Sequence, residues 1–212
     1  MTLGPSTLHR GGHLVLGTTN AGKVRELTIL LAPHQIAVRS LAESPGAVAV
    51  AETGTTFAEN AALKATQQAK ALGSWVLAED SGLVVDALGG APGIHSARFA
   101  TDDSSNNALL LERLAGVPAG SRTAHYACHA ALADPEGRIV AESSGVCCGL
   151  IANGYAGEGG FGYDPLFVVP EYHRTFGELS PEVKALISHR ARAMRSLLPA
   201  ILLHAGAPSV AR

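Results

Sequence analysis

The sequence has little charge and few aromatic rings. Charged residues make up 16% of its 212 residues and aromatic residues 5%, and the formal net charge is −2. A charge so close to zero argues against duplex DNA or an anionic membrane as a partner. No apolar run approaches the roughly 18 residues that a membrane span requires. We therefore expect neither a nucleic-acid nor a membrane partner.

Cysteine is also scarce. The three cysteines are Cys128, Cys147 and Cys148, an odd number without C-x-x-C spacing. This pattern argues against a disulfide framework and against a zinc site. A reducing compartment, the cytoplasm, fits it best.

A length of 212 residues suits one large domain or two small lobes that share a core. Residues 1–12 lack the apolar core of a signal peptide and are expected to form a flexible N-terminal extension. Residues 13–205 are expected to form a single domain of two lobes, and residues 206–212 a C-terminal tail.

Hydrophobic periodicity predicts alternating strands and helices, with one hairpin around Asp134-Pro135-Glu136-Gly137. The predicted strands are 13–17, 36–41, 75–78, 123–133, 138–150 and 166–169, and segment 83–88 continues the third strand after a turn. The predicted helices are 23–31, 57–72, 106–114, a helical turn at 180–182, and a last helix that Ser188 caps and that ends near His204. The fold class is therefore α/β, with a mixed sheet, flanking helices and a cleft between two lobes.

The first strand and helix are joined by a short polar segment made of Thr18, Thr19, Asn20, Ala21, Gly22 and Lys23. A helix N-terminus presents free backbone N–H groups and the positive end of the helix dipole, so it can bind an anion such as phosphate. Lys23 adds a positive charge. An ordinary strand–helix turn with a solvated lysine remains the alternative.

Carboxylates gather near the third predicted strand. Glu79-Asp80-Ser81-Gly82 is predicted to end that strand before a turn, where both acids can point into a cleft, and Glu52 precedes the helix 57–72. Carboxylates are ligands that Mg²⁺ prefers, and one of them can act as general base for water. The alternative is that these acids are solvated.

Basic residues lie on two predicted helices. Lys64 follows Asn60 by four positions and shares its helix face. Lys184 precedes Ser188-His189-Arg190 at the start of the last helix, where a cation is unfavourable unless an anion is close. We therefore favour a ligand near Arg190, whereas Lys64 alone is more commonly solvated.

A glycine-rich run, Gly159 to Gly162, surrounds Phe161 and leads into Tyr163, Asp164 and an apolar segment. Glycine permits close approach of the backbone, the ring of Phe161 offers a face to a flat ligand, and Asp164 offers acceptors. The alternative is a tight loop whose Phe161 belongs to the core.

Together, these segments resemble the inosine triphosphate pyrophosphatase family. The resemblance covers roughly residues 14–203 and includes Thr18–Leu27, Glu52–Ala61, Glu79–Leu83, Gly89–Arg98, the glycine-rich run and Lys184–Arg190. It implies an elongated mixed sheet flanked by helices, two lobes and a central nucleotide-binding cleft. It also implies a homodimer that hydrolyses ITP, dITP and XTP to the monophosphate and pyrophosphate with Mg²⁺.

The resemblance also implies roles for individual residues. Asp80 would bind Mg²⁺ and activate water, and Glu52 would assist the metal. The phosphates would be held by the Thr18–Lys23 segment, Lys64 and Ser81. The purine would lie on Phe161 beside Gly162, Tyr163 and Asp164, with Lys184, His189 and Arg190 at its edge.

Two other functions compete with this one. A Maf-like pyrophosphatase would act on pyrimidine or modified nucleotides, but that family tends to open with a Ser- and Arg-rich loop where this chain has Asn20 and Lys23. A non-enzymatic nucleotide sensor would have no need of acids around a metal.

Overall fold

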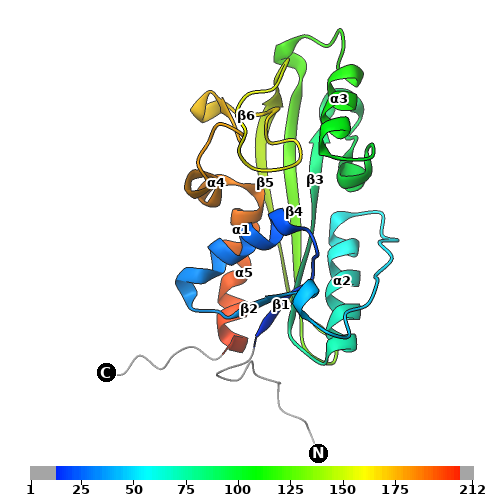
Figure 1. The fold of residues 1–212 in the computed structure, drawn as a ribbon, viewed down its shortest axis with the longest axis vertical. Helices are drawn as coiled ribbons and strands as arrows, with labels where there is room; N and C mark the ends of the chain where they lie inside the picture. Colours follow the sequence, from blue (N-terminus) through cyan, green and yellow to red (C-terminus); the bar gives the residue numbers. More distant parts are fainter. Residues whose placement is uncertain (1–12, 206–212) are drawn as a thin grey trace, which may run out of the picture. The chain divides into compact units, whose positions relative to one another are not determined.

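The computed structural model describes residues 13–205, so the predictions for residues 1–12 and 206–212 lie outside the described residues. Within residues 13–205, seven strands form one sheet in the order β2-β1-β3-β4-β5-β6-β7 (Figure 1). Their bounds are Leu14–Leu16 (β1), Val38–Ser40 (β2), Val76–Val85 (β3), Thr123–Ala133 (β4), Ile139–Ile151 (β5), Phe167–Val169 (β6) and Arg174–Thr175 (β7). β1 pairs in parallel with β2 and β3, and β6 pairs antiparallel with β5 and β7, so the predicted mixed sheet is confirmed.

In the described part of the chain, five α-helices connect and flank the strands. Their bounds are Ala21–Leu31 (α1), Phe57–Leu72 (α2), Asp103–Arg113 (α3), Pro181–Ile187 (α4) and His189–Ala205 (α5). Short 3-10 helices lie at Ala32–His34, Leu41–Glu43, Asp86–Leu88, Gly93–Arg98, Ala119–Ser121 and Pro170–Tyr172. In the described part of the chain, none of the helices has the length and hydropathy needed to cross a bilayer.

Two helices begin earlier than the apolar pattern predicted, because a polar side chain caps each of them. Asn20 accepts a hydrogen bond from the N–H of Lys23, so α1 begins at Ala21 rather than Lys23. Asp102 accepts one from Ser105, so α3 begins at Asp103 rather than Asn106. N-capping satisfies backbone N–H groups that have no partner within the helix.

The chain divides into two compact units. In its described part, unit 1 contains residues 13–80, 129–144 and 193–205, and unit 2 contains residues 81–128 and 145–192. The boundary on β3 falls between Asp80 and Ser81, so this strand contributes residues to both units.

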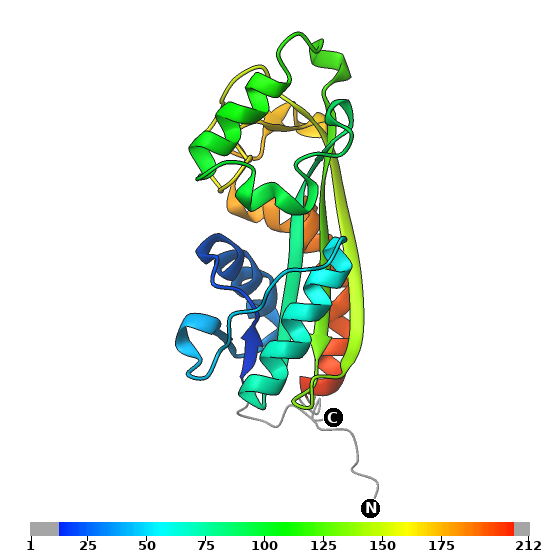
Figure 2. The same cartoon turned by 90° about the vertical axis from the view of Figure 1, so that its right-hand side faces the viewer.

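One part of the core of unit 1 is formed by small side chains of α2 that pack on the sheet. Ala61, Ala65 and Ala69 recur at every fourth position and are almost fully buried. They pack with Val15, Val76, Ala78, Ala131 and Ala133 of β1, β3 and β4. The unit 1 part of α5 lies on the other side of these strands (Figure 2). Since α2 lies flat against β3, polar side chains on the same helix face can reach that strand.

The core of unit 2 is more aromatic. Leu110 and Leu114, at the end of α3, are fully buried. They belong to a cluster that includes Leu83, Val85, Tyr126, Tyr163, Leu166, Phe167 and Phe176. Phe167 and Phe176 stack with their ring centroids 5.3 Å apart. Tyr163, Leu166 and Phe167, which directly follow the glycine-rich run in the sequence, belong to this cluster.

The structure corrects the prediction for the third strand. Glu79-Asp80-Ser81-Gly82 does not end the strand before a turn, because β3 continues from Val76 to Val85. Glycine and short polar residues are typical of turns. Here the two acids have partners on neighbouring helices, described below, so they can remain within a strand.

Candidate active site

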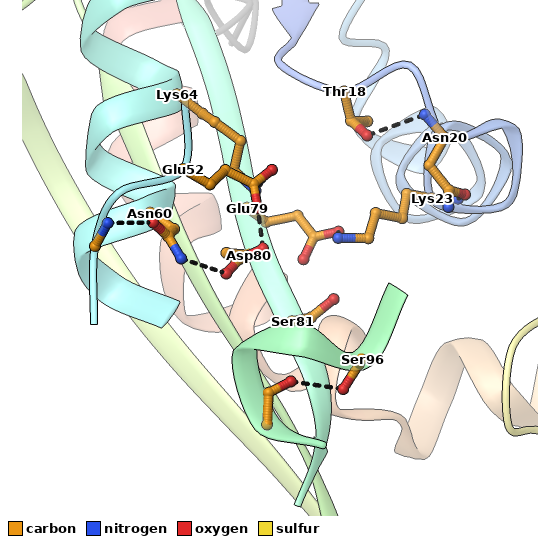
Figure 3. A network of polar contacts seen from close by, with 12 residues as sticks. Thr18, Asn20, Lys23, Glu52, Asn60, Lys64, Glu79, Asp80, Ser81 and Ser96 are labelled. Carbon is orange, nitrogen blue, oxygen red and sulfur yellow. Dashed lines mark hydrogen bonds and ion pairs between the residues drawn. The ribbon is translucent and has the colours of Figure 1, made fainter. Parts of the chain in front are cut away.

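Asp80 is held by two side chains of α2. Nζ of Lys64 lies 2.8 Å from Oδ1 of Asp80, and Nδ2 of Asn60 donates to Oδ2 at 3.3 Å (Figure 3). The same Lys64 ammonium lies 3.4 Å from Oε1 of Glu52. The two carboxylates predicted to hold a metal therefore converge on one positive charge.

Asn60 links Asp80 to the loop that carries Glu52. Its Oδ1 accepts a hydrogen bond of 2.9 Å from the N–H of Gly54, while its Nδ2 faces Asp80. A Cβ on Gly54 would lie 2.7 Å from that Oδ1, so glycine is needed for the close approach. Asn60 was not among the predicted site residues, although its four-residue spacing from Lys64 was the signal that could have added it.

Glu79 and Asp80 form ion pairs with different helices. Successive side chains of a strand alternate between its two faces; Glu79 pairs with Lys23 of α1 at 3.1 Å, and Asp80 pairs with Lys64 of α2. In Figure 3, Lys64 and Lys23 lie on opposite sides of β3. The continuous strand removes the predicted turn after these acids, and a shared cleft for both of them stays a prediction.

The Thr18–Lys23 segment forms the predicted junction between strand and helix. The side chain of Thr18 accepts a hydrogen bond of 3.2 Å from the N–H of Asn20, and Asn20 in turn accepts one of 3.0 Å from Lys23. Thr19 and Ala21 are exposed, and Gly22 is partly buried. The segment thus presents a capped helix N-terminus, with the ammonium group of Lys23 directed to Glu79.

In unit 2, Asp164 braces the glycine-rich run. Its Oδ2 accepts a hydrogen bond of 2.8 Å from the N–H of Phe161, and it forms a buried ion pair with Lys184. Gly160 has a φ of +77°, and a Cβ there would collide with the same carboxylate. Gly160 is therefore required both by its backbone conformation and by the approach of Asp164.

Phe161 lies near two cations and is only partly buried. Nζ of Lys184 is 4.9 Å from the centre of its ring, and Cζ of Arg190 is 5.8 Å from it. Both distances suit cation–π attraction. Phe161 does not belong to the buried cluster of unit 2, which favours a ligand-facing ring over the alternative of a core residue.

Arg190 and His189 occupy the first turn of α5, as the sequence predicted. Ser188 accepts a hydrogen bond of 3.2 Å from the N–H of Ala191 and so caps the helix. Arg190 is 1% exposed and donates a hydrogen bond of 2.9 Å to Oγ of Ser81. The ring of His189 stacks on Tyr126 with centroids 4.6 Å apart. Ser81 and Arg190, 109 positions apart in the sequence, are thus brought together.

Tyr163 is placed differently from its neighbours in the run. It is 3% exposed, and its hydroxyl donates a hydrogen bond of 2.8 Å to the carbonyl of Ser96. Burial raises the pKa of its hydroxyl, with the charge of Asp103 as a second cause. The side chain of Tyr163 therefore supports the run from the core of unit 2.

The structure collects the predicted residues into two groups, each within one unit. Unit 1 holds the Thr18–Lys23 segment, Glu52, Lys64 and Asp80. Unit 2 holds Ser81, Phe161, Gly162, Tyr163, Asp164, Lys184, His189 and Arg190. In the described part of the chain, no group of three or more His, Cys, Asp or Glu side chains is arranged to hold a metal ion.

The chain is similar to known proteins in sequence and in structure. Residues 14–200 match the model of the Ham1 family. The chain is 53% identical over 198 residues to a dITP/XTP pyrophosphatase of Rhodopirellula baltica, covering 92% of this chain and 95% of that protein. A HAM1 protein from Coxiella burnetii has a similar structure, with a TM-score of 0.80 and 37% identity over 90% of this chain and 98% of the other. A nucleoside-triphosphatase / dITP/XTP pyrophosphatase from Mycobacterium abscessus gives a TM-score of 0.69 at 42% identity, covering 88% of this chain and 99% of the other.

Proposed function

Because the chain belongs to the Ham1 family, we propose that it hydrolyses dITP, ITP and XTP to the monophosphate and pyrophosphate. The family match and the names of the relatives favour this function over the Maf-like alternative. The observation that carries it is the convergence of Glu52 and Asp80 on one ammonium group. This is the environment that a divalent cation and a polyphosphate need, and a nucleotide sensor does not require it.

The residues around Asp80 fit Mg²⁺. Two carboxylates that face one cation position supply the hard oxygen ligands that Mg²⁺ prefers, and Mg²⁺ commonly completes its shell with water and phosphate oxygens. Asp80 and Glu52 would hold the ion. When bound, it would neutralise charge on the phosphates and on the leaving pyrophosphate.

The protein's own groups position the reactants. Asp80 accepts the proton of the water that attacks the α-phosphorus, and the hydrogen bond from Asn60 keeps its carboxylate oriented. The N-terminus of α1, Lys64 and Ser81 bind phosphate oxygens, and Lys23 adds positive charge. Phosphoryl transfer depends mainly on positioning and charge neutralisation, so no covalent intermediate is required.

Base selection is assigned to the second group of residues. Phe161 stacks on the purine, with Gly162, Tyr163 and Asp164 behind it, and Lys184, His189 and Arg190 at its edge. A 6-oxopurine presents an acceptor at O6 and a donor at N1, whereas adenine reverses both. An unpaired buried group costs roughly 1–3 kcal/mol, which disfavours ATP.

The enzyme is proposed to act as a homodimer in the cytoplasm. Within the described residues, Cys128, Cys147 and Cys148 form no disulfide, which fits a reducing compartment. Sedimentation of the purified chain tests the dimer.

A pyrophosphate-release panel tests the function. Purified protein is assayed with ITP, XTP, dITP, ATP and GTP, with Mg²⁺ and with EDTA. We expect release from ITP, XTP and dITP that requires Mg²⁺ and exceeds release from ATP by at least about tenfold. Equal release from all five nucleotides would refute the specificity, and no release from any of them would refute the enzymatic function.

A further inference from the structure

Gly162, the residue after Phe161, is held on both sides of its backbone by α3. Its N–H donates a hydrogen bond of 2.8 Å to Oδ2 of Asp103. Its carbonyl accepts one of 2.8 Å from Nδ2 of Asn107. These partners are more than 50 positions away in the sequence, and both lie on the first two turns of one helix. The glycine-rich run is therefore attached to α3 at one residue.

Close approach of other atoms does not require glycine at position 162. Its φ is +62°, and a Cβ built on it would meet no atom within 4 Å. The two hydrogen bonds to α3 are the contacts through which its peptide groups are held. The N–H of Phe161 is fixed separately by Asp164. Two neighbouring residues of the run thus have their backbones held by three different side chains.

The orientation of the Asn107 side-chain amide satisfies its donors but leaves its oxygen without a hydrogen bond from the described residues. It is 4% exposed, and its amide nitrogen donates both to Gly162 and to the carbonyl of Asp103. Its Oδ1 is buried and has no hydrogen-bond partner among the described residues. A buried acceptor without a partner is unfavourable, and an apolar side chain of similar size would avoid the penalty. An apolar side chain, however, could not donate the hydrogen bonds that Asn107 makes to Gly162 and Asp103.

We propose that Asp103 and Asn107 are positioning residues for base recognition. They hold the Gly162 peptide so that the ring of Phe161 stays beside Lys184 and Arg190, ready to stack on the purine. This inference rests on the proposed function, in which Phe161 binds the base. The two residues act through the backbone of the run and do not touch the substrate themselves.

The experiment compares three variants of α3. Asp103→Ala removes the acceptor for Gly162, whereas Asp103→Asn keeps an oxygen that can accept the same hydrogen bond. Asp102→Ala is the matched control, since Asp102 caps the same helix through Ser105. Asp102 and Asp103 are both exposed, and thermal unfolding checks that each variant folds.

Two measurements are made on each variant. Hydrogen–deuterium exchange of the segment 159–165 in the free protein reports on the attachment without any substrate. Asp103→Ala is expected to speed this exchange, and Asp103→Asn and Asp102→Ala are expected to leave it near the wild-type rate. In pyrophosphate release from ITP, Asp103→Ala is expected to raise KM about tenfold while kcat changes less than about twofold. The KM of Asp103→Asn should stay close to that of the wild type.

Unchanged exchange in Asp103→Ala would overturn the attachment. Equal effects of Asp102→Ala and Asp103→Ala on KM would overturn the positioning role and leave only helix stability. If the wild type released no pyrophosphate from any nucleotide, the proposed function and the role in base recognition would both fail. The exchange data would still decide whether α3 holds the run.

Discussion

Nζ of Lys64 lies 2.8 Å from Oδ1 of Asp80, and their side chains are only 12% and 9% exposed. The pair links α2 to β3, and both of its charged groups are largely shielded from solvent. Such a pair is costly to desolvate, so it is weak evidence for a purely stabilising role. The same ammonium also faces Glu52, so it lies between the two carboxylates proposed to bind the metal cation. This position suggests a role in metal and phosphate binding rather than in stability alone.

Lys64→Met is therefore expected to strengthen the binding of a divalent ion in the absence of nucleotide. Two unit charges about 4 Å apart interact by about 4 kcal/mol at an effective dielectric constant near 20, so even partial relief of this repulsion corresponds to about tenfold in affinity. Calorimetric titration with Mn²⁺ measures the affinity directly.

Lys70→Met is the matched control for that titration, because Lys70 is an exposed lysine on the same helix. Its removal should leave Mn²⁺ affinity unchanged. The turnover of Lys64→Met should nevertheless fall, since the same ammonium is proposed to bind phosphate. An Mn²⁺ affinity that is the same in Lys64→Met and wild type would show that Lys64 does not compete with the ion.

Asp80→Asn is expected to lower kcat for ITP by about 10²- to 10⁴-fold, because the amide cannot accept the proton of the attacking water. The fold should survive, since the amide has almost the same shape. Stopped assays of pyrophosphate release and a thermal unfolding curve measure the two effects. Asp86→Asn, an exposed acid directly after the same strand, serves as control. A folded Asp80→Asn variant with full turnover would exclude Asp80 as the base.

The fold could be predicted from periodicity wherever a segment was long and regular. The helix 57–72 is observed with the predicted bounds, and the hairpin strands 123–133 and 138–150 differ by at most one residue at an end. In β3 the prediction failed because Glu79-Asp80-Ser81-Gly82 has the composition of a turn. Its strand conformation depends on partners outside the segment, Lys23 for one acid and Lys64 for the other.

The site could be predicted as a set of residue types, but its pairings could not. Lys23 was assigned to phosphate by its place before α1, yet its ammonium pairs with Glu79, 56 positions away. The attachment of Gly162 to Asp103 and Asn107 was missed for a similar reason. Asp103 lay outside the predicted helix 106–114, and nothing in the local pattern relates it to a glycine 59 positions later.

The cap of α2 predicts a pH dependence. Glu59 accepts hydrogen bonds from the N–H groups of Thr55 and Thr56, and these bonds lower its pKa below the usual 4.5. A carboxyl whose pKa is lower in the folded state contributes stability above its unfolded pKa and loses it as the pH falls through the folded value. This contribution should therefore disappear on acidification below about pH 4.5.

Glu59→Gln provides the test, because glutamine can form the same capping box without titrating. Urea unfolding at several pH values between about 6 and 3 gives the free energy of unfolding of both proteins. The wild type should lose more stability than the variant over the acidic part of this range. Parallel curves would mean that the charge of Glu59 adds nothing to the cap.

Phe161→Ala is expected to reduce kcat/KM for ITP by about 5- to 150-fold, which corresponds to the roughly 1–3 kcal/mol that stacking of a base on an aromatic ring contributes. Phe161→Trp should retain most of the activity because it keeps a flat face. Inorganic tripolyphosphate, which has no base, is the control ligand, and its inhibition constant should be the same in all three proteins. If Phe161 were instead a core residue, Phe161→Ala would lower the thermal stability and weaken tripolyphosphate and ITP alike. A loss of kcat/KM for ITP without a change in tripolyphosphate inhibition would therefore show that Phe161 stacks on the base and is not only a packing residue.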